Sequence, residues 1–568
     1  MLKASPRVEL KLSLPAESGI EAPNLNVADI LRRAGPMVRD RRVWNRFTFR
    51  SALGRMTAMN DSIARVASGH PETTKAAASV LQHGGNAVDA LIAAAWAACV
   101  AEPVLCAPGG GGHALIRMRA RAPVVADFFT QTPARRRVEG SDFYPIQGNF
   151  GAQIQEFHVG LGAAAVPGMV AGLFAMHQRH ATIPMPELVE PAVTLAREGV
   201  ELNAMQAEAL RILEPIVRTD DESARMFGLA SASAPMPAVG DSIGNAALAD
   251  CMELLSREGA LTFYNGDIGT RIAAMSAAGG GHLSLSDLQR YRVRWRRPMQ
   301  WRLNGGTRVW SNPPPAFGGL MVALMTQALA DRLGPGTRFG SKAHLGALIE
   351  AMRLSQDQRG ALERPDCFNS SRVLMQTFQH LGRTHIRTAR GTTQISIRDG
   401  AGNLAGTTLS NGEGCGRVVP GCGFMLNNML GEEDLNRLGF ENWPRNRRLS
   451  SMMAPTLVEH AGTRIILGSG GSNRIRTAIA QVLCNVMHFG MHLQDAVEAP
   501  RIHLEGDVLS LERGSPGWDE AADAWLNAGF PDARRWSGRS LYFGGVHAVT
   551  DDDQAADPRR LGAAWHAD

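Results

Sequence analysis

A glycine followed by two threonines, Gly391, Thr392 and Thr393, lies where a polar loop gives way to an alternating, strand-like segment. This arrangement can be the ordinary start of a strand. It can also be a self-cleaving bond, because a cut between Gly391 and Thr392 would free a threonine as a new N-terminus. Its hydroxyl would be the nucleophile, and its own α-amine, with an unperturbed pKa of about 7.7–8.0, the general base. The β-branch of threonine restricts χ1 and so the direction of Oγ.

The second candidate is a glycine-rich turn, GSGGS at residues 468–472, between a predicted strand and a predicted helix. Consecutive backbone N–H groups at a helix start bind anions. Gly470 and Gly471 can therefore form a structural turn or an oxyanion hole for acyl transfer, worth about 3–4 kcal/mol per donor. A phosphate-binding loop is excluded because no Lys-Ser/Thr pair follows. The glycines at 109–112 precede a strand and lack GxGxxG spacing, so the sequence does not support a dinucleotide fingerprint there.

Two adjacent serines, Ser450 and Ser451, are a cap in one interpretation and a pair of hydrogen-bond donors for a substrate carboxylate in another. The seven cysteines include no CxxC pair with histidines at zinc-binding spacing, so we expect no metal ion and no cofactor. Cys415 and Cys422 lie close together in a glycine-rich segment, and their pairing is left open.

These candidates need a scaffold, and the sequence predicts both helices and strands. From residue 71 to about residue 101 apolar residues recur at spacings of three and four, which predicts two helices, the second capped by Asn86. After residue 390 short β-branched runs flank turn residues in TTQISIRDGAGNLAGTTLS and PTLVEHAGTRIILGSGG, which predicts strand–turn–strand units. The mixture indicates an α+β or layered α/β core. Residues 1–60 have weak periodicity and are predicted to be a peripheral N-terminal extension.

The composition excludes several classes of protein. The chain has 568 residues, of which 44% are hydrophobic and 20% charged, so it is globular rather than disordered or fibrous. No apolar run reaches the roughly 18–20 residues of a membrane helix, and the start shows no secretory pattern, so we expect a cytoplasmic protein. The net charge of +5 comes from scattered basic residues without an aromatic platform, which argues against a nucleic-acid partner.

Taken together, the motifs resemble the γ-glutamyltransferase (glutathione hydrolase) family from about Ser68 to Leu511. The blocks follow the family's order: HPETTKAAASVLQHGGNAVDA, GGGGHAL, AVPGMVAGL, FYNGDIGTRIAAM, LSLSDLQRYRVRWRRP, NPPPAFGGL, TTQISIRDGAGN, VVPGCGFMLNN, SSMMAPTLV and LGSGGSNRI. The resemblance implies an α+β N-terminal-nucleophile (Ntn) hydrolase with a four-layer αββα sandwich, made as a precursor. The implied cut before Thr392 would give a large subunit, residues 61–391, and a small catalytic subunit, residues 392–568.

Carried over residue by residue, the resemblance makes Thr392 the nucleophile and Thr408 a second threonine that hydrogen-bonds to its hydroxyl. The strand before Thr408 is about two residues shorter than the family pattern, and an even shortening keeps Thr408 on the same face. Glu432 stands where the family usually has an aspartate that grips the substrate's α-amino group, and Ser410 where many members have an asparagine. The other carried-over residues are the oxyanion region, the carboxylate-binding serines and a residue near the site: Gly470 and Gly471, Ser450 and Ser451, and Asn428.

The largest departure is Phe129, which stands where the family places an arginine that clamps the γ-glutamyl carboxylate. Phenylalanine cannot replace a bidentate charged partner. We expect a self-processing threonine amidohydrolase or acyltransferase that cleaves γ-glutamyl, glutathione-like amides through an acyl-enzyme on Thr392. The alternatives are an amidase or acylase with another donor, such as a cephalosporin-type or oxamate-like amide, and a non-catalytic relative. The expected partners are a small-molecule amide and the two subunits of one precursor, without membrane or nucleic acid; the oligomeric state is open, a homo-oligomer included.

Overall fold

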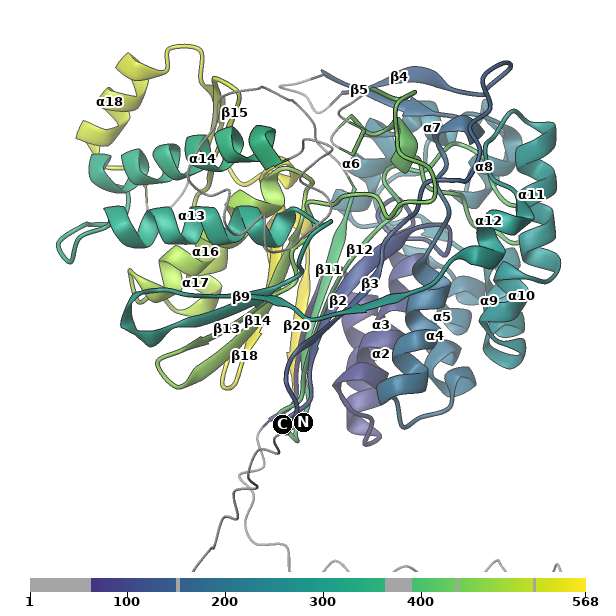
Figure 1. Cartoon of the computed structure of the whole chain (residues 1–568), viewed down its shortest axis with the longest axis horizontal. Helices are drawn as coiled ribbons and strands as arrows, with labels where there is room; N and C mark the ends of the chain where they lie inside the picture. Colours follow the sequence, from purple (N-terminus) through teal and green to yellow (C-terminus); the bar gives the residue numbers. More distant parts are fainter. Residues whose placement is uncertain are drawn as a thin grey trace, which may run out of the picture. The chain divides into compact units, whose positions relative to one another are not determined.

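The computed structural model describes residues 63–149, 154–362, 391–433, 435–436, 439–513 and 517–567, with only the main chain described for 358–362. The N-terminal extension predicted for residues 1–60 lies outside this part of the chain. The described residues form two large antiparallel sheets with helices on their outer faces (Figure 1).

The first sheet has seven strands in the order β20-β1-β11-β12-β2-β3-β8, and every neighbouring pair is antiparallel. The hairpin predicted around the DGAGN turn is confirmed, because β11 and β12 pair from Thr393 opposite Leu409 to Arg398 opposite Leu404. The strands are β1 (Arg65–Ser68), β2 (Gly111–Arg117), β3 (Val124–Phe128), β8 (Arg294–Arg296), β11 (Thr393–Arg398), β12 (Leu404–Ser410) and β20 (Ala563–His566).

The second sheet has six strands in the order β19-β18-β14-β13-β10-β9, again antiparallel throughout. The second predicted hairpin is confirmed as β13 and β14, which pair from Thr456 opposite Leu467 to His460 opposite Thr463. The strands are β9 (Met299–Arg302), β10 (Arg308–Ser311), β13 (Thr456–His460), β14 (Thr463–Gly470), β18 (Gly545–Thr550) and β19 (Gln554–Ala555).

The two sheets pack face to face through a small apolar cluster with members from both: Ala67, Leu115, Val125 and Leu404 from the first, and Trp310, Leu457, Ile466 and Val549 from the second. The outer face of the first sheet is covered by α2 (Pro71–Gln82), α3 (Ala87–Ala101) and α4 (Met169–His180), with α5 (Met185–Glu198) behind them. The outer face of the second is covered by α13 (Gly318–Arg332), α16 (Arg474–Met487) and α17 (Leu493–Glu498), with α14 (Lys342–Leu362) on α13 (Figure 1). The predicted four-layer αββα sandwich is confirmed.

The alanine-rich helix α3 explains how the helical layer approaches the first sheet so closely. Every residue of α3 is buried, because α2, α4 and α5 flank it and β11 and β12 lie beneath it. Small side chains are what such crowding requires. The predicted cap is confirmed, since Asn86 and Asp89 form a reciprocal capping box at its start. At its other end α3 delivers Glu102 beside the start of β11.

The remaining elements surround this core. Smaller sheets are formed by β4 (Tyr144–Asn149) with β5 (Ile154–Val159), by β6 (Val200–Glu201) with β7 (Ser242–Ile243), and by β15 (Ile502–Glu505), β16 (Val508–Glu512) and β17 (Arg534–Trp536). The other helices are α6 (Ala204–Ile212), α7 (Glu214–Val217), α8 (Asp221–Met226), α9 (Ala246–Glu258), α10 (Ala260–Tyr264), α11 (Asp267–Ala278), α12 (Leu285–Arg290) and α18 (Glu520–Gly529). Within the described ranges no helix has the length and apolarity needed to cross a bilayer.

Both large sheets contain strands from before and after residue 391, and in the first sheet these strands are interleaved. In the first sheet β1 lies between β20 and β11, and β12 pairs with β2. In the second, β13 pairs with β10. The two predicted subunits therefore share both sheets, and neither sheet belongs to one of them alone.

Candidate active site

The β11–β12 hairpin places Thr392 and Ser410 next to each other. Thr392 immediately precedes β11, Ser410 ends β12, and the adjacent pair in the ladder is Thr393 with Leu409. Both side chains donate to the carbonyl oxygen of Gly391: Thr392 Oγ1 at 2.7 Å and Ser410 Oγ at 2.7 Å. Ser410 Oγ in turn accepts a hydrogen bond from the Gly412 N–H at 2.9 Å. Two hydroxyls therefore converge on the carbonyl of the predicted cleavage bond.

The predicted hydrogen bond between Thr408 and Thr392 is wrong. Thr408 Oγ1 donates instead to Gln394 Oε1 at 2.6 Å, because Thr408 lies directly opposite Gln394 in the ladder. Residues two apart on a strand share a face, so Thr408 lies on the same face of β12 as Ser410 but one step farther along the strand. Ser410 occupies the position beside the Thr392 hydroxyl that the family comparison had given to Thr408.

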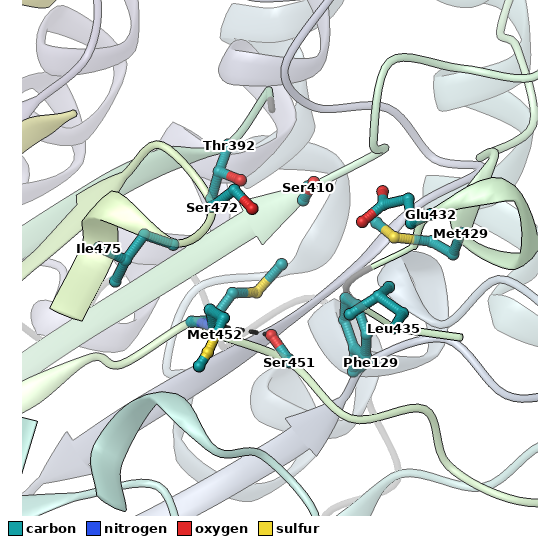
Figure 2. Close-up of a pocket in the computed structure, with 11 residues that line it drawn as sticks. Phe129, Thr392, Ser410, Met429, Glu432, Leu435, Ser451, Met452, Ser472 and Ile475 are labelled. Carbon is teal, nitrogen blue, oxygen red and sulfur yellow. Dashed lines mark hydrogen bonds between the residues drawn. The ribbon is translucent and has the colours of Figure 1, made fainter. Parts of the chain in front are cut away.

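A small cavity of about 30 Å³ opens in front of Thr392 (Figure 2). Five of the residues predicted for the site line it: Thr392, Ser410, Glu432, Ser451 and Phe129. Met429 also lines it, and sequence reasoning did not assign five further lining residues, which are Leu435, Met452, Met453, Ser472 and Ile475. Ser472 lies beside Thr392 in Figure 2 and has a φ of 52°, a left-handed conformation that serine rarely adopts. Strained backbone of this kind concentrates at functional sites.

The turn after β14 lies against the backbone of the candidate nucleophile. A Cβ added to Gly470 would lie 2.0 Å from the Thr392 carbonyl oxygen, so only glycine fits there. Gly471 has a φ of 110°, and α16 begins at Arg474. Gly470 and Gly471 do not line the cavity, and their oxyanion role stays a prediction. Their place beside Thr392, at a helix N-terminus, is compatible with it.

Asn428 and Ser450 are near the site without lining the cavity. Asn428 donates to Glu413 Oε2 at 3.0 Å and accepts from the Glu413 N–H at 2.9 Å. Glu413 Oε1 accepts from the Gly391 N–H at 3.4 Å, so Asn428 supports the segment at the cleavage bond. Ser450 is half-buried. Ser451 lines the cavity, and its Oγ accepts from the Met453 N–H at 3.0 Å.

Phe129 belongs to an apolar wall of the cavity, in a cluster with Ala165, Met429, Leu430, Trp443, Leu449 and Met453. The basic groups behind it are already engaged. Arg448 ion-pairs with Asp127 and also donates to the Phe129 carbonyl oxygen. His113 stacks on the Phe129 ring, and burial lowers the pKa of His113 to about 4, so it is neutral near pH 7. None of the described residues lining this cavity is basic.

A second buried carboxyl lies on the other side of β11. Glu102 accepts hydrogen bonds from Thr393 Oγ1 at 2.6 Å and from Thr73 Oγ1 at 3.1 Å. Burial raises the pKa of Glu102 to about 7, although the two threonine hydrogen bonds act in the opposite direction. The residue after the candidate nucleophile is therefore bonded to a group that titrates near neutral pH.

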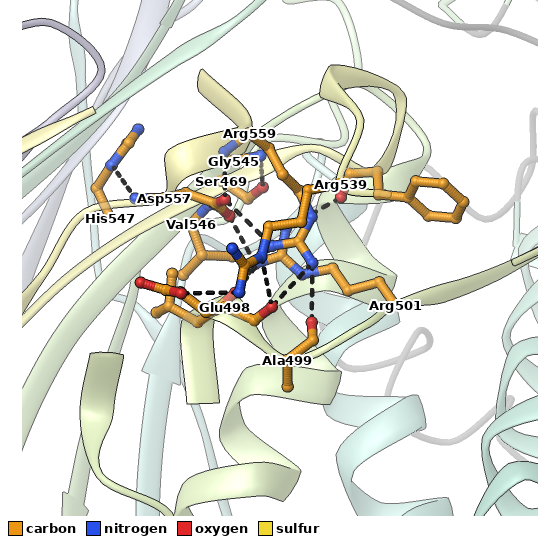
Figure 3. Close-up of polar contacts among 12 residues, drawn as sticks. Ser469, Glu498, Ala499, Arg501, Arg539, Gly545, Val546, His547, Asp557 and Arg559 are labelled. Carbon is orange, nitrogen blue, oxygen red and sulfur yellow. Dashed lines mark hydrogen bonds and ion pairs between the residues drawn. The ribbon is translucent and has the colours of Figure 1, made fainter. Parts of the chain in front are cut away.

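A buried ion network fixes the C-terminal segment beside the glycine turn (Figure 3). Asp557 pairs with Arg501 at 2.6 Å and with Arg559 at 3.1 Å, and it accepts from the Val546 N–H at 2.8 Å. Burial alone would raise the pKa of Asp557, but the two arginines hold it below its usual value. Arg559 also pairs with Glu512 at 2.6 Å. This network holds β18 next to β14, the strand that leads into the turn.

The described residues contain no group of three or more His, Cys, Asp or Glu side chains placed to hold a metal ion. Cys415 and Cys422 are buried free thiols and do not form a disulfide.

An αββα core with a threonine at the start of a central strand defines the class as an Ntn hydrolase or acyltransferase. The family model described as Gamma-glutamyltranspeptidase matches residues 73–567, and the chain belongs to that family. It is 28% identical over 535 residues to the Acylase ACY 1 proenzyme of Pseudomonas sp. (strain SE83), covering 89% of this chain and 92% of that protein. It is also 28% identical over 490 residues to the Glutathione hydrolase proenzyme of Escherichia coli, covering 79% and 82%. Among solved structures, cephalosporin acylase from Bacillus halodurans shares the fold with a TM-score of 0.73 and 22% identity, over 92% of this chain and 99% of that one.

Proposed function

We propose that the chain cuts itself between Gly391 and Thr392 and then uses Thr392 to take acyl groups from amides. In the first step Thr392 Oγ1 attacks the Gly391 carbonyl carbon and the C–N bond breaks, while the hydroxyl proton passes to the freed nitrogen. Water then hydrolyses the ester, which leaves a carboxylate on Gly391 and a free amine on Thr392. The Ser410 hydroxyl supports this step, because it donates to the oxygen on which negative charge develops.

After the cut the same hydroxyl attacks the amide of a substrate. The α-amine of Thr392 takes the hydroxyl proton and gives it to the departing amine, and the acyl group stays as an ester on Thr392 Oγ1. Water completes hydrolysis, or a second amine accepts the acyl group. The observation that carries the proposal is the convergence of the Thr392 and Ser410 hydroxyls on the Gly391 carbonyl oxygen.

For the acyl donor, we infer a group that lacks the free carboxylate of a γ-glutamyl chain. More than half of the lining side chains are apolar, those of Phe129, Met429, Leu435, Met452, Met453 and Ile475, and none of the described lining residues is basic. A carboxylate entering this cavity would lose water without gaining a cation.

Self-cleavage is tested on a denaturing gel of the purified full chain. The wild type should separate into pieces spanning 1–391 and 392–568, whereas Thr392→Ala should remain one band. Thr270→Ala, a change at an exposed helical threonine, is the matched control and should cleave like the wild type. A wild-type chain that stays intact after long incubation would refute the self-cleavage mechanism.

The donor is tested with p-nitroanilides of equal acyl length that differ in charge: γ-glutamyl, glutaryl and pentanoyl. The pentanoyl compound should give the highest kcat/KM, by about tenfold or more, because it carries no carboxylate into the apolar cavity. A γ-glutamyl compound turned over better than the pentanoyl one would refute the donor and restore glutathione-like substrates. The gel result decides self-cleavage independently of the donor.

A further inference from the structure

Arg560 is a buried arginine whose side chain has no hydrogen-bond or ion-pair partner among the described residues. Only 5% of the residue is exposed, and its Nε is a buried donor without an acceptor. Burying an unpaired guanidinium is unfavourable, because its N–H donors lose hydrogen bonds to water and gain none within the protein. The neighbouring Arg559 shows the usual solution, with ion pairs to Glu512 and Asp557.

The Arg560 guanidinium lies against the glycine turn after β14. A Cβ on Gly470 would lie 2.0 Å from the Thr392 carbonyl oxygen and 3.6 Å from Arg560 Cζ, and one on Gly471 would lie 3.7 Å from Arg560 Nη2. The stem of Arg560 runs over Gly545 on β18, where a Cβ would lie 2.2 Å from Arg560 Cγ. The absence of side chains at these three glycines therefore leaves the space that the Arg560 side chain occupies. Arg560 does not line the cavity, so its side chain would not touch a donor bound there.

The charges around Arg560 do not neutralise it at contact distance. Its two acidic neighbours are engaged elsewhere: Asp557 pairs with Arg501 and Arg559, and Glu102 accepts hydrogen bonds from two threonine hydroxyls. Two other arginines repel it. Burial lowers the pKa of Arg560 to about 10, which still leaves it positive at neutral pH. The N-terminus of α16 adds potential of the same sign at this turn.

We propose that Arg560 is a positioning residue for acyl transfer: from behind the Gly470–Gly471 turn its charge stabilises the negative oxygen of the tetrahedral intermediate formed on Thr392. This inference rests on the proposed function. No bond to Arg560 forms or breaks, and its effect grows as the substrate carbonyl oxygen gains charge. Because it favours the intermediate over the bound donor, it raises kcat and leaves KM nearly unchanged.

The test compares Arg560→Met and Arg560→Lys with Arg539→Met, which changes an arginine that is half-exposed and paired with Glu498. Rates are measured on the full chain with the best donor of the panel and divided by the amount of cleaved protein on the gel. We expect Arg560→Met to lower kcat about tenfold with KM within about twofold, and Arg560→Lys to recover most of the loss. Arg539→Met should match the wild type.

Thermal stability separates this role from a structural one. An arginine that served only the fold would lower Tm when replaced, whereas an unpaired buried arginine replaced by methionine should leave Tm equal or higher. If Arg560→Met is not cleaved but keeps the wild-type Tm, kcat and KM are compared between Arg560→Lys and the wild type instead. If Arg560→Met keeps the wild-type kcat, the inference is overturned. The same holds if its activity falls only because Tm is lower or KM is higher. In both cases the proposed function stands. A wild type that neither cleaves nor turns over any donor overturns both.

Discussion

The Ser410 hydroxyl and the Gly391 carbonyl oxygen lie 2.7 Å apart, across the open end of the β11–β12 hairpin. The carbonyl of the bond before Thr392 therefore receives a hydrogen bond from the facing strand as well as from Thr392 itself. A donor held at a carbonyl stabilises the negative charge that nucleophilic attack creates there. Ser410 is thus the side chain best placed to assist the cut.

Replacing Ser410 by alanine should slow self-cleavage about a hundredfold, the effect of removing one donor from a developing oxyanion. Thr408→Val should leave the cleavage rate within a few-fold, because the Thr408 hydroxyl is bound to Gln394. It should instead lower the free energy of unfolding by about 1–3 kcal/mol, since Gln394 loses a buried partner. The appearance of the two bands over time measures both rates. The reverse ranking would return the assisting role to Thr408.

Gly470→Ala should abolish self-cleavage, because its Cβ would meet the Thr392 carbonyl oxygen at 2.0 Å and push the nucleophile away from its position. Gly538→Ala is the matched control, since a Cβ there has no atom of the structure within 4 Å. Gels report cleavage and thermal melting reports folding. A Gly470→Ala chain that cleaves at the wild-type rate would contradict the close approach of the turn to Thr392.

Phe129→Leu should change which acyl chains are accepted. The smaller side chain lengthens the apolar cavity, so the kcat/KM for an octanoyl anilide relative to the pentanoyl one should rise about tenfold. Phe530→Leu, at a half-buried phenylalanine just after α18, controls for loss of aromatic volume. An unchanged ratio in Phe129→Leu would mean that Phe129 does not limit the acyl group.

Glu102 should make stability depend on pH. Burial raises its folded-state pKa from 4.5 to about 7, so the folded chain holds the proton more tightly than the unfolded chain. Its contribution is fully present below pH 4.5 and is lost as the pH rises through 7, by up to about 3 kcal/mol. In urea titrations, the free energy of unfolding of the wild type should therefore exceed that of Glu102→Gln by an amount that decreases between pH 4.5 and 7. A difference that does not vary with pH would contradict the shift.

The local structure around the site could be predicted where turn chemistry and alternation were strong. The DGAGN turn between β-branched runs predicted the hairpin that carries Thr392, and the position of Phe129 in the cavity wall followed from the family's motif order. Thr408 was misplaced because a strand's alternation fixes the face of a side chain but not its position along the strand. Leu435 and Met452 lie outside regular elements, so no periodicity pointed to them. A cytoplasmic location and the boundaries of the two subunits stay predictions.

Because strands from both sides of residue 391 are interleaved in the first sheet, folding and cleavage can occur in only one order. A cut leaves β1 hydrogen-bonded between β20 and β11, so the two pieces can separate only by tearing open a sheet. Folding must precede the assisted cut, because Ser410 reaches the Gly391 carbonyl only in the finished hairpin. Once cut, denatured halves would have to find each other in solution to rebuild ladders that the intact chain assembled within itself. The cut protein therefore depends on the uncut chain having folded first, because the uncut chain forms the shared sheets.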